Sequence, residues 1–407
     1  MSEWKEYNLT EVCDTISDTY RDSAEKVVLI NTSDVLEGNV TNHELVPNKN
    51  LAGQFKKKFQ KDDILYSEIR PANRRYAYVD FEPKDYIAST KLMVLRSKPC
   101  ILPKYLYYLL TNNTTIRTLH AIAVGRSGTF PQITYSELAN IKFQLPSLKE
   151  QEEILSTLLY FDDKIVINRR ICENLEAQAQ ALFKHWFIDF APFKDDKFVE
   201  SDLGMIPEGW RVVSLDDACI KITDGSHYSP KDDPHGTIPM LSVKDMLHNG
   251  FDYSSCKMIN EEEYEKMKAN DCIPLKNDIL VAKDGSYLKE IFLCFKEERQ
   301  AILSSIALFR CNINVLYPEL LLQLLRLPRV RKDVGDNYVS GSALPRIVLK
   351  DFKKFRFVIA PIDVQNRIID TMQSLTNEIH INEMESRKLA QLRDVLLPKL
   401  MSGQIKL

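Results

Sequence analysis

Two long amphipathic segments of this chain repeat nearly the same sequence. The first, QEEILSTLLYFDDKIVIN, begins at Gln151, and the second, QNRIIDTMQSLTNEIHIN, begins at Gln365, 214 residues later. The two segments share Gln, Ile, Thr, Ile, Ile and Asn at matching positions. Self-similarity at a fixed period is the signature of a repeated structural unit. Any fold assigned to this chain must therefore contain that unit twice.

Apolar residues in both segments recur in alternating steps of four and three, which is the core spacing of a coiled coil. This spacing predicts two long helices that pair with each other. The expected helix-pairing residues are Ile154, Leu158, Phe161, Ile165, Asn168, Leu175, Leu182, Ile368, Met372, Leu375, Ile379, Asn382, Leu389 and Leu396. A polar residue in such a core fixes register at a cost in stability, and both helices carry Asn at the same position.

The residues alone leave the direction of the pairing open. In a parallel pair the two Asn side chains would face each other. In an antiparallel pair Asn168 would face Ser386, and Cys172 would face Asn382. The alternative to both is that each amphipathic helix packs only on its own domain.

The repetition extends beyond the helices. WKEYNLTEVC at Trp4 resembles WRVVSLDDAC at Trp210, and DIL at Asp63 recurs at Asp278. SGTFPQI, beginning at residue 127, corresponds to SGSALPRI, beginning at residue 340. Short β-branched runs such as KLMVLRS and IALFRC predict strands, whereas LPKYLYYLLTNN and YPELLLQLLRLP predict amphipathic helices.

We therefore expect an α+β protein with two duplicated domains, each containing mixed, curled β-sheets with helices and each followed by a long helix. The expected segments are residues 1–146 for the first domain, 147–190 for the first helix, 191–360 for the second domain and 361–407 for the second helix.

Composition excludes several classes of protein. The formal net charge of −3 argues against indiscriminate affinity for nucleic acid, so any phosphate-binding surface must be local. No run of about 18 uncharged apolar residues is present, as a membrane-spanning helix requires. The beginning of the chain, MSEWKEYNLTEV, lacks the basic and apolar parts of a signal peptide, and the eight cysteines form no CxxC pair. We expect reduced thiols and a cytoplasmic location.

The common catalytic motifs are missing from the sequence. It contains no GxxxxGK[ST] phosphate-binding loop, no [DNS]PP[YFW] signature of amino-group methyltransferases and no HExxH pair. The acidic run INEEEYEK lacks the partners of a nuclease site and is typical of a solvated helix face. We expect no catalytic site, no cofactor and no metal.

Four further stretches point to a family. They are QALFKHWFIDFAPF, DLGMIPEGW, TDGSHYSP and LLPKLMSGQIKL. With the duplicated plan, they resemble the specificity subunits of type I restriction–modification enzymes over nearly the whole chain. The resemblance implies two target-recognition domains separated by two helices that pair antiparallel.

The resemblance also implies a function. Such a subunit binds double-stranded DNA at a bipartite, asymmetric sequence, with one half-site for each domain, and has no catalysis of its own. It holds two adenine-methylating (M) subunits, which motor–nuclease (R) subunits join. The alternative hypothesis is a coiled-coil scaffold that does not bind DNA.

Three loops of the second domain carry side chains suited to DNA contact. The candidates are Ser226, His227, Tyr228, Lys283, Gly285, Ser286, Tyr287, Gly341, Ser342 and Arg346. Each loop has a competing interpretation. TDGSHYSP could be a turn whose polar groups bond one another, the residues after DILVA an ordinary hairpin, and the third loop one that simply enters a final strand at Ile347.

The first domain lacks both TDGSHYSP and the KDG sequence, so its DNA contacts are harder to place. The candidates are Arg70, Arg74, Arg75, Arg126, Ser127, Gly128, Thr129 and Gln132. Solvated surface arginines are the competing interpretation of the first three, and for the others it is a loop that simply enters a final strand at Ile133. Gln132 and Arg346 each follow the shared proline, and their side chains carry the donors that suit adenine and guanine, respectively.

Overall fold

The computed structural model describes residues 4–49, 51, 53–125 and 131–405. The chain forms two compact units. One contains the chain up to Val166 together with the segment from Arg387 onward, and the other contains Ile167–Ser386.

The first unit contains a central antiparallel sheet and a second sheet with one parallel pair. The central sheet has the order β2 (Cys13–Ile16), β11 (Leu92–Ser97), β8 (Ile64–Ser67) and β9 (Tyr76–Tyr78). The second has the order β6 (Leu45–Pro47), β3 (Lys26–Ile30), β10 (Tyr86–Ser89) and β7 (Phe55–Lys57), with β3 and β10 parallel. Two further pairs are β1 (Lys5–Asn8) with β12 (Lys142–Leu145), and β4 (Val35–Leu36) with β5 (Asn39–Val40).

The second unit repeats this topology. Its central sheet has the order β16 (Cys219–Asp224), β24 (Ile306–Cys311), β21 (Asp278–Ala282) and β22 (Ile291–Leu293). Its second sheet has the order β20 (Lys257–Ile259), β17 (Ile238–Leu241) and β23 (Ala301–Ile302), again with one parallel pair, β17 with β23. The remaining pairs are β15 (Arg211–Ser214) with β27 (Arg356–Ile359), β13 (Phe198–Ser201) with β14 (Gly204–Pro207), β18 (Met246–Leu247) with β19 (Gly250–Phe251), and β25 (Val339–Ser340) with β26 (Arg346–Ile347).

Short helices complete each unit. The first has α1 (Leu9–Val12), α2 (Pro103–Thr111), α3 (Asn113–Val124) and α4 (Tyr135–Ala139), and the second has α6 (Leu215–Ala218), α7 (Glu261–Ala269), α8 (Pro318–Leu325), α9 (Pro328–Asn337), α10 (Leu349–Phe352) and α11 (Ile362–Asn366). Helices α2 and α8 are the two expected amphipathic helices. Each begins with proline at its first position, where the missing N–H costs nothing. The predicted α+β class with duplicated domains is confirmed.

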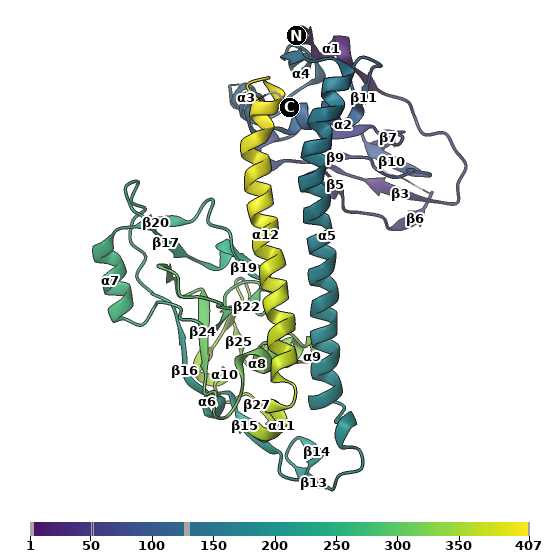
Figure 1. Ribbon diagram of the computed structural model, residues 1–407. Helices are drawn as coiled ribbons and strands as arrows, with labels where there is room; N and C mark the ends of the chain where they lie inside the picture. Colours follow the sequence, from purple (N-terminus) through teal and green to yellow (C-terminus); the bar gives the residue numbers. More distant parts are fainter. Residues whose placement is uncertain (1–3, 50, 52, 126–130, 406–407) are drawn as a thin grey trace. The chain divides into compact units, whose positions relative to one another are not determined.

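The two long helices, α5 (Leu148–Phe187) and α12 (Ile369–Met401), run antiparallel within each unit (Figure 1). In the first unit Leu158 shares a buried cluster with Leu397 and Leu400. In the second unit Cys172 Sγ lies 3.6 Å from the carbonyl oxygen of Ile379. Within the first unit Leu158 and Asp162 contact Leu397 and Arg393, and within the second unit Asn168 and Cys172 contact Glu385 and Ile379. In each unit the partner numbers fall along α12 as they rise along α5, so the predicted antiparallel pairing is confirmed.

The hydrogen bonds of the buried asparagine involve partners that the apolar spacing did not indicate. The Asn168 amide donates to Glu385 Oε2 at 2.7 Å and lies 3.4 Å from the carbonyl oxygen of Asn382, rather than bonding Ser386. The Ser386 hydroxyl is already used, because it donates to the Asn382 carbonyl of its own helix at 2.8 Å. A carboxylate is also the stronger acceptor for a buried amide.

The second long helical segment is interrupted near its start. Helix α11 ends at Asn366 and α12 begins at Ile369. Between them, the N–H groups of Arg367 and Ile368 donate to carbonyls three residues back, each at 3.1 Å. The first long helix has no such break.

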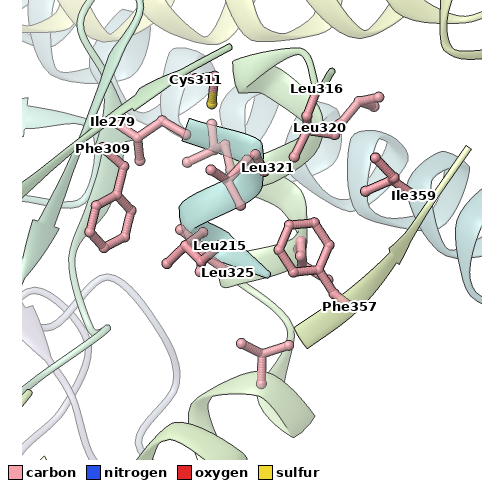
Figure 2. Packing of buried hydrophobic residues seen from close by; sticks show 14 of the residues in the cluster. Leu215, Ile279, Phe309, Cys311, Leu316, Leu320, Leu321, Leu325, Phe357 and Ile359 are labelled. Carbon is pink, nitrogen blue, oxygen red and sulfur yellow. The ribbon is translucent and has the colours of Figure 1, made fainter. Parts of the chain in front are cut away.

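Apolar burial holds the second unit together around its central sheet (Figure 2). All five residues of β21 are buried, which explains why the four residues after Asp278 are all apolar. The labelled core residues are Leu215, Ile279, Phe309, Cys311, Leu316, Leu320, Leu321, Leu325, Phe357 and Ile359.

A buried glutamine attaches each long helical segment to the domain before it. The Gln151 side-chain amide donates to the Cys100 and Pro146 carbonyls at 3.2 and 3.1 Å and accepts from Leu102 N at 2.9 Å. Gln365 makes the equivalent bonds to the Val315 and Ala360 carbonyls, both at 2.9 Å, and accepts from Tyr317 N at 3.3 Å. All six partners are backbone atoms, so this attachment does not depend on the side chains of the domain.

Candidate nucleic-acid interface

Three candidate loops of the second unit converge at the end of its central sheet. Asp224, at the end of β16, forms a short ion pair with Lys283, which follows β21. Gly285 N donates to the Pro345 carbonyl at 2.7 Å, and Arg346 Nε lies 3.2 Å from Asp284 Oδ1. The segments 223–230, 283–287 and 340–346, far apart in sequence, therefore form one surface.

Glycine makes the first of these loops possible. Gly225 N donates to the Ile306 carbonyl at 3.1 Å. A Cβ atom at this position would lie 2.2 Å from the Ile302 carbonyl oxygen, a distance that real side chains do not adopt. Gly225 therefore allows a backbone approach that no other residue permits.

Replacing Gly225 by alanine should destabilise the second unit by about 1–3 kcal/mol, because the added methyl group collides with backbone atoms that cannot rotate away. Urea denaturation of the full chain would measure the loss. Gly53→Ala is the matched control, because a Cβ there meets nothing within 4 Å. Equal effects of the two substitutions would contradict the close approach.

The converging loops present some candidates outward and bury others. His227 and Tyr228 are exposed, as are Ser286, Gly341, Ser342 and Arg346. Ser226 and Lys283 lie in the interior, whereas Gly285 and Tyr287 are half-buried. The Ser226 hydroxyl accepts from Tyr228 N at 3.1 Å and donates to the Tyr228 carbonyl at 2.7 Å. Ser226 and Lys283 thus shape the loops instead of facing outward.

The first unit has the same backbone arrangement with different side chains. Arg70 N donates to the Pro131 carbonyl at 2.9 Å, as Gly285 N does to Pro345. Gln132 lies opposite Ile69 in an isolated antiparallel bridge, as Arg346 lies opposite Asp284. Arg70 is exposed and Gln132 is half-buried.

The other first-domain candidates divide into two groups. Arg74 Nη2 donates to Asn113 Oδ1 at 2.6 Å, and Arg75 Nη1 donates to the Ser33 carbonyl at 2.9 Å. These two half-buried arginines therefore hold neighbouring loops together in this structure. Residues 126–129, which include Arg126, Ser127, Gly128 and Thr129, lie outside the described part of the chain.

None of the expected helix-pairing residues is exposed. Ile154, Leu158, Asn168, Ile368, Met372 and Ile379 are buried, and Phe161, Ile165, Leu175, Leu182, Leu375, Asn382, Leu389 and Leu396 are half-buried. By contrast, other apolar side chains on the long helices are exposed. Ile167, Ile171, Ile381 and Met384 belong to the second unit, and Tyr160, Leu392 and Val395 to the first.

A polar junction fastens the β18–β19 turn to α5 in the second unit, beside a cleft of about 500 Å³. Glu176 Oε2 lies 3.0 Å from His248 Nε2, and its Oε1 accepts from the Asn249 amide at 2.8 Å. Arg326 donates to Asn249 Oδ1 and to the Ile291 carbonyl, both at 2.7 Å.

The junction shifts the pKa of its titratable groups. Burial alone would raise the pKa of Glu176, but hydrogen bonds from His248 and Asn249 and the charge of Arg326 lower it overall. The hydrogen bond to Glu176 raises the pKa of His248 above its ordinary value, against the opposing effects of burial and Arg326. Glu290 Oε2, 3.7 Å from His248 Nδ1, also favours the charged imidazole.

The second unit should lose a little stability as pH rises. A His248 pKa that is raised on folding contributes fully below the unfolded-state pKa, and this contribution is lost as pH rises through the folded-state pKa. His248 is 56% exposed, so we expect at most about 1 kcal/mol. Urea denaturation at about pH 5.5 and about pH 8.5 should show this loss, and Glu176→Gln should reduce it. An unchanged pH dependence in the variant would contradict the role of the junction.

Sequence reasoning missed Asp224 and Asp284 as members of this surface. Both carboxylates contact cationic candidates, Lys283 and Arg346. The available signal was the Asp-Gly pair that occurs in both TDGSHYSP and KDGSY.

Within the described residues, no group of three or more His, Cys, Asp or Glu side chains is placed to hold a metal ion. None of the helices in that part of the chain is long and apolar enough to cross a membrane.

Comparison with known proteins gives concordant matches. A family model described as "Type I restriction modification DNA specificity domain" matches residues 1–177 and 207–391. The chain is 28% identical over 480 residues to the Type I restriction enzyme HindI specificity subunit of Haemophilus influenzae, covering 100% of both chains. It is 30% identical over 355 residues to the MjaIX specificity subunit of Methanocaldococcus jannaschii, covering 86% of this chain and 78% of the relative.

Among solved structures, the chain is similar to the S subunit of a type I restriction–modification system from M. genitalium. The TM-score is 0.53 at 16% identity, over 98% of this chain and 96% of the other. This likeness supports the duplicated fold.

Proposed function

Because the chain belongs to the family of type I restriction–modification DNA specificity domains, we propose that each of its two domains recognises one half of a bipartite, asymmetric DNA target. The family match and the named relatives support DNA specificity rather than a scaffold that does not bind DNA. The domains proposed from the sequence are residues 1–146 and 191–360. Each contains one strand-end surface, formed by the loops at the end of its central sheet, and we assign one such surface to each half-site.

One observation carries the proposal. The two units place different side chains on the same backbone frame, with Arg70 and Gln132 in one and Gly285 and Arg346 in the other. A shared frame with unlike side chains suits two readers of unlike sequences, because base edges are distinguished by the pattern of donors and acceptors that a protein offers.

We assign direct DNA contact in the second domain to the outward-facing His227, Tyr228, Ser286, Ser342 and Arg346, with Gly341 allowing close approach. Ser226, Lys283, Gly285 and Tyr287 shape these loops. In the first domain Arg70 and Gln132 are the corresponding contacts, and Arg74 and Arg75 position the loop beside them. Arg126, Ser127, Gly128 and Thr129 stay candidates on sequence grounds.

The chain acts without catalysis of its own, in the cytoplasm, as a subunit bound to two methyltransferase subunits that motor–nuclease subunits join. The exposed apolar side chains of the long helices support the binding of partner subunits. Ile167 with Ile171 and Leu392 with Val395 are spaced four and three residues apart, so each pair lies on one helix face. Such apolar faces are typical of surfaces that partner proteins cover.

The test is DNA binding by the chain assembled with its methyltransferase partner. Gel-shift selection from a random DNA library should recover two fixed half-sites separated by a spacer. Recovery of no preferred sequence would refute the proposed function. A scaffold predicts, in addition, that charge reversal at Arg70 and Arg346 leaves DNA affinity unchanged.

A further inference from the structure

We infer that Arg346, oriented by Asp284, recognises a guanine in the half-site of the second domain, and that Gln132 recognises an adenine from the equivalent position of the first. This inference rests on the proposed function, which places these loops against DNA. It identifies Arg346 and Gln132 as the side chains that distinguish bases, and Asp284 as the carboxylate that orients Arg346.

The two residues are equivalent by backbone geometry. Ile133 N donates to the Glu68 carbonyl at 2.8 Å, and Ile347 N donates to the Lys283 carbonyl at 3.0 Å. Gln132 forms an antiparallel bridge with Ile69, the second residue after β8. Arg346 forms the same kind of bridge with Asp284, the second residue after β21.

The chain turns at the same place in both units after this pairing. Arg70 has φ +47° and Gly285 has φ +70°, so both adopt the left-handed conformation. Each then donates its N–H to the proline carbonyl before Gln132 or Arg346. The backbone therefore delivers the Gln132 and Arg346 side chains from corresponding positions.

Asp284 is placed to orient the Arg346 guanidinium. Residues directly opposite in an antiparallel pair point their side chains to the same face, and Arg346 Nε lies 3.2 Å from Asp284 Oδ1. The Asp284 side chain is 12% exposed, whereas that of Arg346 is 56% exposed. Asp284 Oδ1 is buried and accepts no hydrogen bond from a described residue; the cations beside it are Arg346 Nε at 3.2 Å and Lys283 Nζ at 4.0 Å.

The ion pair favours base recognition over phosphate contact. A carboxylate beside Arg346 offsets part of the charge that would attract a phosphate, but it leaves the directional donors in place. With Nε facing Asp284, the two terminal nitrogens remain for a pair of acceptors. Guanine offers such a pair, O6 and N7, in the major groove.

The first domain offers different chemistry at the same position. Gln132 lies opposite Ile69, so its bridge partner offers no carboxylate, unlike Asp284 opposite Arg346. A glutamine amide can donate an N–H to adenine N7 while its carbonyl oxygen accepts from the adenine N6 amino group. The two domains should therefore differ at corresponding positions of their half-sites, with guanine in one and adenine in the other.

The test uses the chain assembled with its methyltransferase partner and DNA libraries randomised in one half-site at a time. Arg346→Gln should change the preferred base at one position of the second half-site from guanine to adenine, with a loss of about 5- to 150-fold in discrimination for guanine. Gln132→Arg should produce the converse change in the first half-site.

Two further variants separate base recognition from a simple charge effect. Arg346→Lys keeps the charge but loses the planar pair of donors, so it should relax the preference for guanine while retaining overall affinity. Asp284→Asn should relax the same position, because the guanidinium loses its orienting charge, and no other position should change. Arg356→Gln is the matched control, since Arg356 is 49% exposed and lies 2.7 Å from Asp202.

The possible outcomes distinguish the inference from the proposed function. Uniformly weaker binding of Arg346→Gln to all sequences, with guanine still preferred, would identify a phosphate contact and overturn the inference. An unaltered first half-site in the same experiment shows that the variant complex is intact. A wild-type complex without preference in either half-site would instead overturn the proposed function.

Discussion

Replacing Asp278 by alanine is expected to destabilise the second unit by about 3–5 kcal/mol, because it leaves a largely buried guanidinium without its partner. Asp278 is fully buried and accepts from Arg310 Nε and Nη2, both at 2.7 Å. It also accepts from Leu275 N at 2.7 Å, so the substitution removes three hydrogen bonds at once. For a unit of this size the melting temperature should fall by about 6–20 °C.

Hydrogen exchange on the full chain would show where the loss occurs. Amides of β21 and β24 should lose protection in Asp278→Ala, whereas the central sheet of the first unit should keep it. Asp202→Ala is the control, because Asp202 and Arg356 form an exposed pair worth at most about 1 kcal/mol. A melting temperature as high as that of this control would contradict the expectation.

The double variant Asp278→Ala with Arg310→Met tests the cause. Removing both charges should recover part of the lost stability, since an uncompensated charge costs more than a missing pair. Recovery should be incomplete, because the Leu275 N–H still lacks its acceptor.

The first unit contains the same constellation. Asp63 is fully buried and accepts from Arg96 Nε at 2.7 Å, from Arg96 Nη2 at 2.8 Å and from Gln60 N at 2.8 Å. The sequence DIL recurs at Asp63 and Asp278, but the sequence alone does not show why both positions carry aspartate. Each aspartate links the start of one central strand to an arginine on the neighbouring strand of the sheet, β11 or β24. Each also accepts a backbone N–H from the turn before its strand.

Sequence pattern was sufficient to predict the long helices, several central strands and the duplication of the unit. Apolar runs such as the ILVA of β21 identify strands buried on both faces, and the four-and-three spacing identifies the long helices. The break at Arg367 and Ile368 was not predicted, since the apolar spacing continues through it. Asn168 marked the helix pair correctly, but its partner Glu385 lies outside the apolar spacing.

The candidate site was harder to predict because exposure depends on tertiary contacts. Lys283 follows a strand like a surface residue, yet its ammonium is buried against Asp224, 59 residues earlier in the chain. Arg74 and Arg75 form a dense basic group, yet they bond Asn113 and Ser33. No local pattern distinguishes such arginines from ones that face DNA.

Exchanging residues 1–146 for the matching segment of a relative with a different target should replace one half-site completely and leave the other unchanged. Two features of the structure favour an intact graft. Strands β1 and β12 pair from Lys5 with Leu145 to Asn8 with Lys142, so both ends of the transplanted segment meet at one place. Gln151, just beyond the junction, bonds only backbone atoms of the segment and should accept a foreign domain.

One side-chain contact limits the choice of donor. The Tyr108 hydroxyl donates to the Asp162 carboxylate on α5. Asp162 Oδ1 also forms an ion pair with Arg393 Nη1 at 2.7 Å. A donor with phenylalanine at that position would leave Asp162 with one partner fewer, so the graft should retain tyrosine. The same graft with and without Tyr108→Phe measures what this contact contributes to assembly.

Methylome sequencing of cells carrying the graft would give both half-sites in one experiment. If each domain recognises DNA through its own strand-end surface, the half-site assigned to residues 191–360 must persist, because no side chain of that surface has changed. Alteration of both half-sites would mean that the two surfaces do not act independently. Loss of all methylation with the chain still assembled would mean instead that the attachment through Gln151 does not suffice to place a foreign domain on DNA.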